Sequence, residues 1–153
     1  MTEVPVAPRV AVKSVPPVDV VFVRARVAVR DIGRLFAAAG RKLHGPAAGA
    51  PLVIYHDAIF DPEAADVEVA YPVKADAEET LLPVTAASIT HVGPYERLNE
   101  AYGLLSAWVA DHGLRQSGAV REIYLIGPGD VDDPEHFVTE VQMPVEQRGL
   151  SEL

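Results

Sequence analysis

The sequence EVAYPV at residues 68–73 returns as EVQMPV at residues 140–145, 72 residues further along the chain. The glutamate, the first valine, the proline and the final valine keep their places in both copies. In the second copy, Val141 and Met143 alternate with Glu140 and Gln142, which is typical of a strand with two different faces. A strand that occurs twice in one chain indicates that the fold is built from two related halves.

Working outward from these strands, three more pairs of segments match in the same order: 17–18 with 83–84 and 32–43 with 98–109 at an offset of 66, and 54–55 with 123–124 at an offset of 69. The offset grows only between segments, where loops tolerate insertions. The length of 153 residues corresponds to one domain. We expect halves at about residues 9–73 and 79–145, with a flexible tail at 146–153.

Within each half the hydrophobic period changes from two to 3.6, which predicts strands around one helix. Ile32, Leu35, Phe36 and Ala39 form one helical face in the first half, and Leu98 to His112 repeat this pattern in the second. The strands are predicted at residues 10–15, 18–27, 52–56, 67–73, 80–84, 86–92, 123–125 and 138–145, the first two forming a hairpin or a tight connection at a Pro-Pro pair.

These elements predict an α+β fold of two pseudo-symmetric β-β-α-β-β halves. The strands form one curved antiparallel sheet with both helices on its convex face. Two sheets joined side by side make a curved surface with a cleft at the internal axis, and clefts at internal interfaces are common ligand sites.

Composition narrows the function classes. The chain has 13 basic and 22 acidic side chains, a net charge of −9, and no cysteine. The charge disfavours direct binding to nucleic acid, and the missing thiols exclude thiol catalysis and disulfides. The sequence has no signal peptide or apolar run long enough to span a membrane, so we expect a cytoplasmic protein. No metal, cofactor or nucleophile motif is present, so no metal or cofactor is predicted.

Three motifs in the second half resemble the GyrI-like small-molecule-binding domain, also called the AraC-type or BmrR-like effector-binding domain. They are HVGPYE at residues 91–96, REIYL at 121–125 and TEVQMPV at 139–145. The resemblance covers about residues 10–145. The first half departs from the pattern, because residues 26–29 read RVAV where the motif has Gly-Pro-Tyr.

The resemblance implies binding of hydrophobic, often cationic, drug-like molecules. Members of the family occur behind a helix-turn-helix in multidrug-responsive transcription regulators, or alone. Because the first predicted strand lies close to the start of the sequence, we expect the form without a DNA-binding domain.

Glu122 is the main candidate for contact with such a ligand. If Ile123 and Leu125 face the helix, Glu122 and Tyr124 face the other side of the sheet and line the cleft there. A carboxylate beside an aromatic ring can hold a cation, and the resemblance implies a sheet glutamate among tyrosines in this role. A solvated or ion-paired glutamate is the alternative.

Four other residues complete the predicted ligand site. Tyr124 and its repeat partner Tyr55 are expected to face the cleft, Glu140 to contribute a second carboxylate, and Trp108 to reach the edge of the cleft. Glu140 has a structural partner as its alternative, and Trp108 has core packing. Tyr71 and Tyr102 are predicted to be core residues.

Three function classes follow. The first is a binding module that sequesters or senses hydrophobic cations. The second is a hydrolase that opens strained cyclopropane rings of DNA-alkylating compounds, as the resemblance allows, with Glu122 and Tyr124 as catalytic groups and Glu140 second. The third is a protein-interaction module of the gyrase-protecting type. The natural ligand, the occurrence of turnover, and a homodimer or regulatory protein as partner stay open at the level of sequence.

Overall fold

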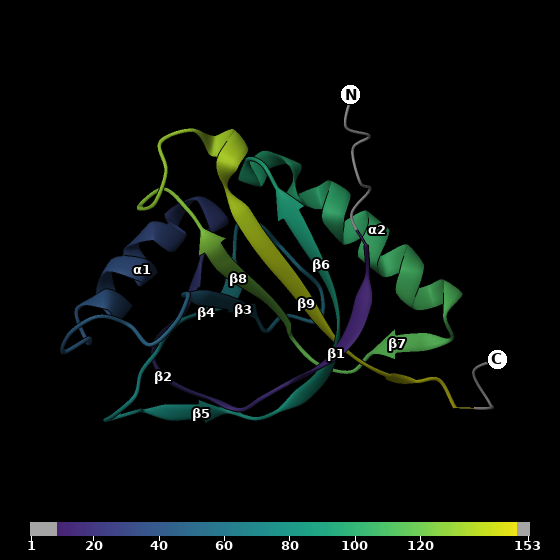
Figure 1. Ribbon diagram of the computed structural model, residues 1–153, viewed down its shortest axis with the longest axis horizontal. Helices are drawn as coiled ribbons and strands as arrows, with labels where there is room; N and C mark the ends of the chain where they lie inside the picture. The colour runs from purple at the N-terminus through teal and green to yellow at the C-terminus, as the bar shows by residue number, and fades with distance from the viewer. Residues whose placement is uncertain (1–8, 150–153) are drawn as a thin grey trace, which may run out of the picture.

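The computed structural model describes residues 9–149, and these residues contain nine strands, all paired antiparallel (Figure 1). The strands are β1 (Ala11–Val15), β2 (Val18–Val27), β3 (Leu52–Tyr55), β4 (Ala65–Pro72), β5 (Glu79–Leu81), β6 (Val84–Val92), β7 (Leu114–Gln116), β8 (Val120–Ile126) and β9 (Val138–Gln147). The sheet order is β1-β6-β9-β8-β3-β4-β2-β5, and β7 pairs with the end of β9.

Two helices complete the repeat. Helix α1 (Ile32–Gly40) follows a 3-10 turn at Val29–Asp31, and helix α2 (Leu98–Asp111) follows a 3-10 turn at Tyr95–Arg97. The two turns and the two helices begin 66 residues apart, which is the offset expected from the sequence. Gly113, with a φ of +68°, follows α2 in the left-handed conformation that commonly ends helices.

Equivalent strands of the two halves lie at equal distances on either side of the β3–β8 pair, so a pseudo-two-fold axis passes between these two strands. Val53 and Glu122 occupy equivalent positions in the two halves, at the offset of 69, and they also lie directly opposite each other in the β3–β8 register. The axis therefore passes through this pair.

The first strand of each half pairs with the other half. Strand β1 pairs with β6, and β5 pairs with β2. The predicted strands are present, but β1 and β2 form a tight connection without a hairpin, because Pro16 and Pro17 lead the chain from one edge of the sheet to the other.

This exchange of first strands, by which β1 pairs with β6 and β5 with β2, also explains the curvature of the sheet. The two-residue links β1–β2 and β5–β6 each join strands near opposite edges, so those edges must approach each other at one end of the molecule (Figure 1). Arg121 donates a hydrogen bond of 3.3 Å to the carbonyl of Leu82 in the second link. The links therefore cross the face opposite the helices, and the helices lie outside the curl.

The buried apolar side chains of residues 9–149 gather in three clusters. One lies between α2 and the sheet around the fully buried Leu105, and one lies between α1 and the sheet around Val67 and Val69. The third lies on the opposite face, around Leu52 and Ile54. These clusters confirm the predicted α+β fold with both helices on one face of a curled sheet.

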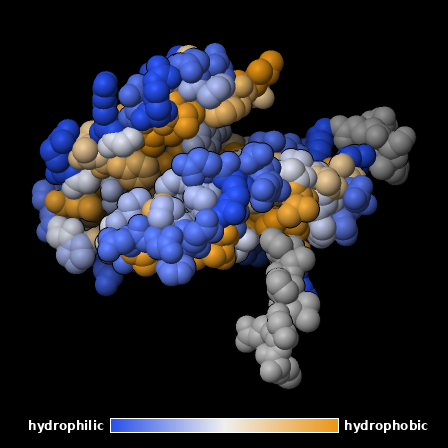
Figure 2. All heavy atoms as spheres, turned by 90° about the horizontal axis from the view of Figure 1, so that it is seen from above, coloured by the Kyte–Doolittle hydropathy of each residue, from blue (hydrophilic) through white to orange (hydrophobic). Residues whose placement is uncertain are grey.

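The space-filling view shows apolar atoms in a hollow between hydrophilic ridges (Figure 2). Among residues 9–149, no helix is both long and apolar enough to cross a membrane. Strand β7 is absent from the sequence prediction, and β9 continues to Gln147, which pairs with Leu114. Of the predicted tail, residues 150–153 lie outside the described residues.

Candidate functional site

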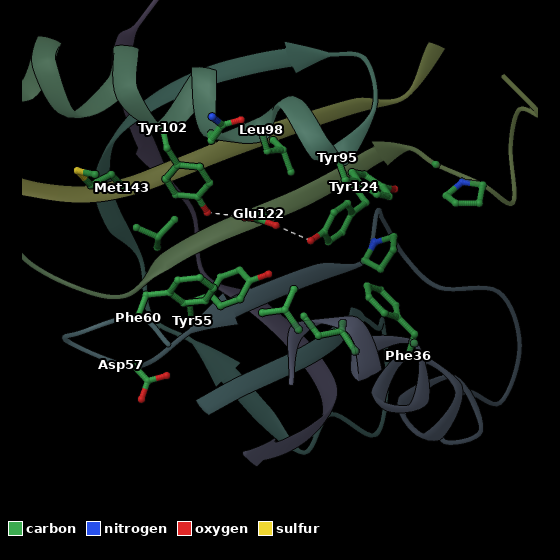
Figure 3. A pocket seen from close by; sticks show the side chains of 18 of the residues that line it. Phe36, Tyr55, Asp57, Phe60, Tyr95, Leu98, Tyr102, Glu122, Tyr124 and Met143 are labelled. Carbon is green, nitrogen blue, oxygen red and sulfur yellow. Dashed lines mark hydrogen bonds between the residues drawn. The ribbon is translucent and has the colours of Figure 1, made fainter. Parts of the chain in front are cut away.

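A cavity of about 1220 Å³ lies between the two helices, over the central strands β3 and β8. Both halves contribute to it, and its walls are mainly aromatic and aliphatic (Figure 3). The side chains with aromatic or ionisable groups that line it are Phe36, Tyr55, Asp57, Phe60, Tyr71, Tyr95, Tyr102, Glu122, Tyr124 and Asp130.

Glu122 lies at the centre of this cavity and is 5% exposed. The Tyr102 hydroxyl donates a hydrogen bond to Oε2 of Glu122, and the Tyr124 hydroxyl donates one of 2.5 Å to Oε1 (Figure 3). Among residues 9–149, no lysine, arginine or histidine forms an ion pair with Glu122. The carboxylate is thus held by hydroxyl groups and lacks a counter-charge from the described chain.

Burial controls the ionisation of this cluster. Burial raises the pKa of Glu122, although hydrogen bonds from Tyr102, Tyr124 and Tyr55 act in the opposite direction. Burial, followed by the negative charge of Glu122, raises the pKa of each of the three tyrosines. The tyrosines therefore keep their protons at neutral pH and act as hydrogen-bond donors.

Aromatic rings form a continuous wall along the cavity. Tyr95 stacks on Phe137 with ring centroids 5.1 Å apart and meets Tyr124 edge-on at 5.7 Å. Tyr124 meets Phe36 edge-on at 5.7 Å, and Phe36 meets Tyr71 at 6.4 Å. The face of each such ring carries partial negative charge, so the wall offers both apolar contact and attraction to cations.

The sequence repeat explains how these side chains meet. Tyr102 and Phe36 are equivalent residues one turn into α2 and α1, 66 residues apart, and both point from their helix toward the sheet. Tyr55 and Tyr124 are equivalent residues on β3 and β8, 69 residues apart. The pseudo-two-fold axis therefore brings one ring from each helix and one tyrosine from each central strand around Glu122.

The predicted orientation of β8 is wrong. Glu122 and Tyr124 face the helices, where they contact Tyr102 and Phe36, and the cavity lies on this helical face. Ile123 faces the opposite side, where it packs with Leu52 and Ile54. Both faces of β8 are covered, so the choice of face cannot be made from the alternation alone. A register shift between Tyr124 and Ile126 further leaves Leu125 47% exposed.

Two predicted ligand residues lie outside the cavity. Glu140 lies on the opposite face, where it pairs with Lys13 and accepts hydrogen bonds from Ser88 (2.7 Å) and Gln142 (3.0 Å). Burial raises the pKa of Glu140, but Lys13, Gln142 and Ser88 together lower it by more, so this pKa lies below its usual value. Trp108 packs against the α2 cluster and stacks on His112 at 3.8 Å. Glu140 thus has a structural partner and Trp108 packs in the core, which are the alternatives to a ligand role given for these two residues.

Tyr102 and Tyr71 line the cavity although both are predicted from the sequence to be core residues, and Tyr95 lines it as well. The internal repeat carried a usable signal, because Phe36 aligns with Tyr102 and differs from it by the hydroxyl that reaches Glu122. Among residues 9–149, no group of three or more histidine or acidic side chains is placed to hold a metal ion.

The family pattern described as the GyrI-like small molecule binding domain matches residues 8–146. No protein of curated function matches the chain. The crystal structure of the EcmrR C-terminal domain is 26% identical, with a TM-score of 0.84, and the match covers 94% of this chain and 100% of that one. In the cryo-EM structure of an EcmrR–DNA complex, also 26% identical with a TM-score of 0.82, the match covers 92% of this chain and 58% of the EcmrR chain.

Two more distant structures share the fold. One is a hydrolase encoded by lin2189 from Listeria innocua, 15% identical with a TM-score of 0.62, and the match covers 92% of this chain and 94% of that one. The other is SAV2435 bound to tetraphenylphosphonium, 14% identical with a TM-score of 0.57 and coverages of 94% and 96%.

Proposed function

The chain belongs to the GyrI-like small-molecule-binding family, and from this premise we propose that its cavity binds hydrophobic organic cations. The observation that carries the proposal is the buried carboxylate of Glu122, which has hydroxyl donors but no basic partner among residues 9–149. A buried charge is costly unless an opposite charge joins it. A cation that enters the cavity supplies that charge.

Each part of the cavity has a role in this proposal. Glu122 is the counter-charge, and the hydroxyls of Tyr102 and Tyr124 hold its two oxygens in place. The rings of Phe36 and Tyr55 supply apolar contact and their electron-rich faces. Glu140 and Trp108 take no part.

The similar structures support the same class of ligand and indicate the kind of protein in which such a domain occurs. SAV2435 is a protein of this fold with tetraphenylphosphonium, a hydrophobic cation, bound to it. EcmrR carries the domain on a longer chain that occurs in a complex with DNA. We infer that the present domain senses or sequesters its ligand, and that its net charge of −9 keeps it from contacting DNA directly.

Titration with tetraphenylphosphonium and rhodamine 6G tests the proposal. Glu122→Gln keeps the size of the side chain and removes the charge, so affinity should fall by about 1.5–3 kcal/mol, the order of a Coulomb attraction over roughly 6–10 Å at an effective dielectric constant near 20. This corresponds to a Kd roughly 10- to 150-fold weaker. Glu140→Gln is the matched control, because it removes a carboxylate from the opposite face of the sheet, and it should bind like wild type.

Two further results complete the test. A neutral analogue, triphenylphosphine oxide, should bind wild type and Glu122→Gln equally. If Glu122→Gln binds the cations as wild type does, or if both variants weaken binding alike, the carboxylate is not the counter-charge and the proposal fails.

Hydrolysis of a strained ring is the second candidate, favoured by the hydrogen-bonded Tyr102–Glu122–Tyr124 group. Opening a cyclopropane with water requires one group that accepts a proton from water and one that donates a proton to the opened product. A carboxyl with a raised pKa next to tyrosine hydroxyls can serve both needs. Turnover of a cyclopropane-containing alkylating compound should fall about 10²–10⁴-fold in Glu122→Gln. Saturable binding without product would exclude this candidate.

A further inference from the structure

The cavity has two ends that the pseudo-two-fold axis relates. The loop after β3 brings Asp57 and Phe60 to one end, and the loop after β8 brings residues 127–130 to the other. In Figure 3, Asp57 and Phe60 lie on the side of Tyr55, away from Tyr95 and Tyr124. Each loop thus places one aspartate, Asp57 or Asp130, on the cavity wall.

The two aspartates differ in their partners. Asp57 is 14% exposed, and its Oδ1 pairs with Arg26 at 3.1 Å while its Oδ2 accepts the backbone N–H of Asp66 at 2.6 Å. Asp130 is exposed, and its Oδ2 accepts the backbone N–H of Gly127 at 2.9 Å. Within the described part of the chain, Asp130 pairs with no basic side chain. Only the Asp130 end therefore presents an acid whose charge is not already paired.

Tyr95 lies between Asp130 and the central Glu122. A methyl group on Gly127 would lie 3.2 Å from the Tyr95 hydroxyl oxygen, so this loop packs directly on the tyrosine. The ring of Tyr95 meets the ring of Tyr124, whose hydroxyl binds Glu122. Burial raises the pKa of Tyr95, and the charges of Glu122 and Asp130 raise it further, which places both carboxylates within electrostatic reach of one hydroxyl. An aromatic surface thus joins the two acids.

The size of the cavity leaves room beyond one compact ligand. Its volume of about 1220 Å³ exceeds the roughly 300–1000 Å³ that is usual for pockets holding drug-sized molecules. A compact cation in contact with Glu122 leaves the Asp130 end to be filled by the rest of a longer molecule.

From this arrangement we propose that the cavity prefers elongated organic dications, with one cationic centre at Glu122 and the second at Asp130. The inference rests on the proposed function, because it assumes a cation at Glu122. It assigns to Asp130 the selection of ligand length and charge. The linker between the two cationic centres lies along the rings of Tyr95 and Tyr124, which favours an alkyl or aromatic linker over a polar one.

Two probes that differ in a single charge test this assignment. Decamethonium has a quaternary ammonium group at each end of a ten-carbon chain, and decyltrimethylammonium has the same chain with one such group. Competition with a fluorescent cation should give decamethonium an affinity about 1.5- to fivefold higher for wild type, as expected for an added exposed charge pair. The advantage should shrink at high salt, because exposed charges are screened.

The Asp130→Asn variant should lose this advantage while its affinity for decyltrimethylammonium stays unchanged. Asp132→Asn is the control, since Asp132 is an exposed acid in the same loop that does not line the cavity. It should retain the preference. The proposal is overturned if wild type does not favour decamethonium, if Asp130→Asn keeps the preference, or if Asp130→Asn weakens both probes alike. Unchanged binding of decyltrimethylammonium to Glu122→Gln would instead overturn the proposed function.

Discussion

The two halves of the molecule share a backbone plan but differ in polarity where they meet the cavity. Val53, Phe36 and Val29 of the first half correspond to Glu122, Tyr102 and Tyr95 of the second. The first half thus builds the same strand, helix and turn with apolar side chains alone. The fold does not need the polar group, so its presence in one half only indicates a function in the cavity.

The same comparison separates repeated from unrepeated features. Tyr55 and Tyr124 recur at equivalent positions on β3 and β8, and both line the cavity. The carboxylate beside them occurs once, opposite Val53 on the pseudo-two-fold axis. The symmetric residues shape the cavity, and the asymmetric ones determine its charge.

The largest expected effect concerns Leu105, whose counterpart in the first half is Ala39. Both side chains are fully buried under their helices. Leu105→Ala gives the second half the smaller side chain of the first, but its neighbours are arranged around leucine, so a cavity results. Stability should fall by about 2–5 kcal/mol in urea unfolding.

Leu104→Ala is the control for that variant, because Leu104 is 50% exposed on the same helix. Its unfolding free energy should change by no more than about 0.5 kcal/mol. Equal effects of the two variants would show that the second half can close around alanine, as the first half does.

The next effect concerns the charge of Glu122 and its dependence on pH. Folding raises the pKa of this carboxyl, so the folded state favours the protonated form, and stability falls as the pH rises from the unfolded value through the folded one. Glu122→Gln should therefore be more stable than wild type at pH 7, by about 1–2 kcal/mol. The difference should vanish below about pH 4, the usual range of a glutamate pKa.

Chemical unfolding of both proteins across this pH range measures the effect. Cation affinity should change in the opposite direction and rise with pH as Glu122 ionises. A stability difference that does not vary with pH would mean that the carboxyl stays in one ionisation state, and that its charge has no part in the contrast with Val53.

A smaller effect is expected from Tyr102→Phe, which gives the second half the residue that Phe36 supplies in the first. The variant removes one hydrogen bond to Glu122. This bond is stronger to the carboxylate than to the protonated carboxyl, and the difference between the two is about 0.5–1.5 kcal/mol. The pKa of Glu122 should rise further, so the pH midpoint of cation binding should move upward by up to about one pH unit. Fluorescence titration at a series of pH values gives this midpoint.

Tyr71→Phe is its control, since Tyr71 lines the cavity from β4 and its hydroxyl lies beside Gly40. The midpoint should not move in this variant. A shift of the same size in both variants would mean that the pKa responds to the polarity of the whole cavity and not to the Tyr102 hydroxyl.

The repeat made much of this structure predictable from sequence. Equal offsets identified both helices and most strands, and the pairing of Tyr55 with Tyr124 followed from them. The orientation of β8 could not be inferred, because Glu122 and Ile123 both lie on covered faces and alternation distinguishes only a covered face from an exposed one. Tyr102 shares the apolar periodicity of α2, so its hydroxyl contact was not evident.

The pairing partner of each strand could not be predicted from the local sequence pattern either. The sequence of β1 is equally compatible with β2 or β6 as its neighbour, and only the chain path through Pro16 and Pro17 decides between the two. Sequence periodicity describes the two faces of a strand but carries little information about which strand pairs with it.

The reciprocal exchange of β1 and β5 has a consequence for how this protein forms on the ribosome. Strand β1 cannot pair until β6 has been synthesised, and residues 84–92 of β6 follow β1 by more than 60 positions. Strand β2 likewise lacks its edge partner until β5 is available. Such distant pairings slow folding, because the intervening chain must be ordered before they form. A nascent first half has open strand edges at both sides, and open edges recruit other chains. The second half therefore protects these edges once it has been synthesised, and aggregation of this protein should begin from chains whose first half is exposed before β5 and β6 are available to pair.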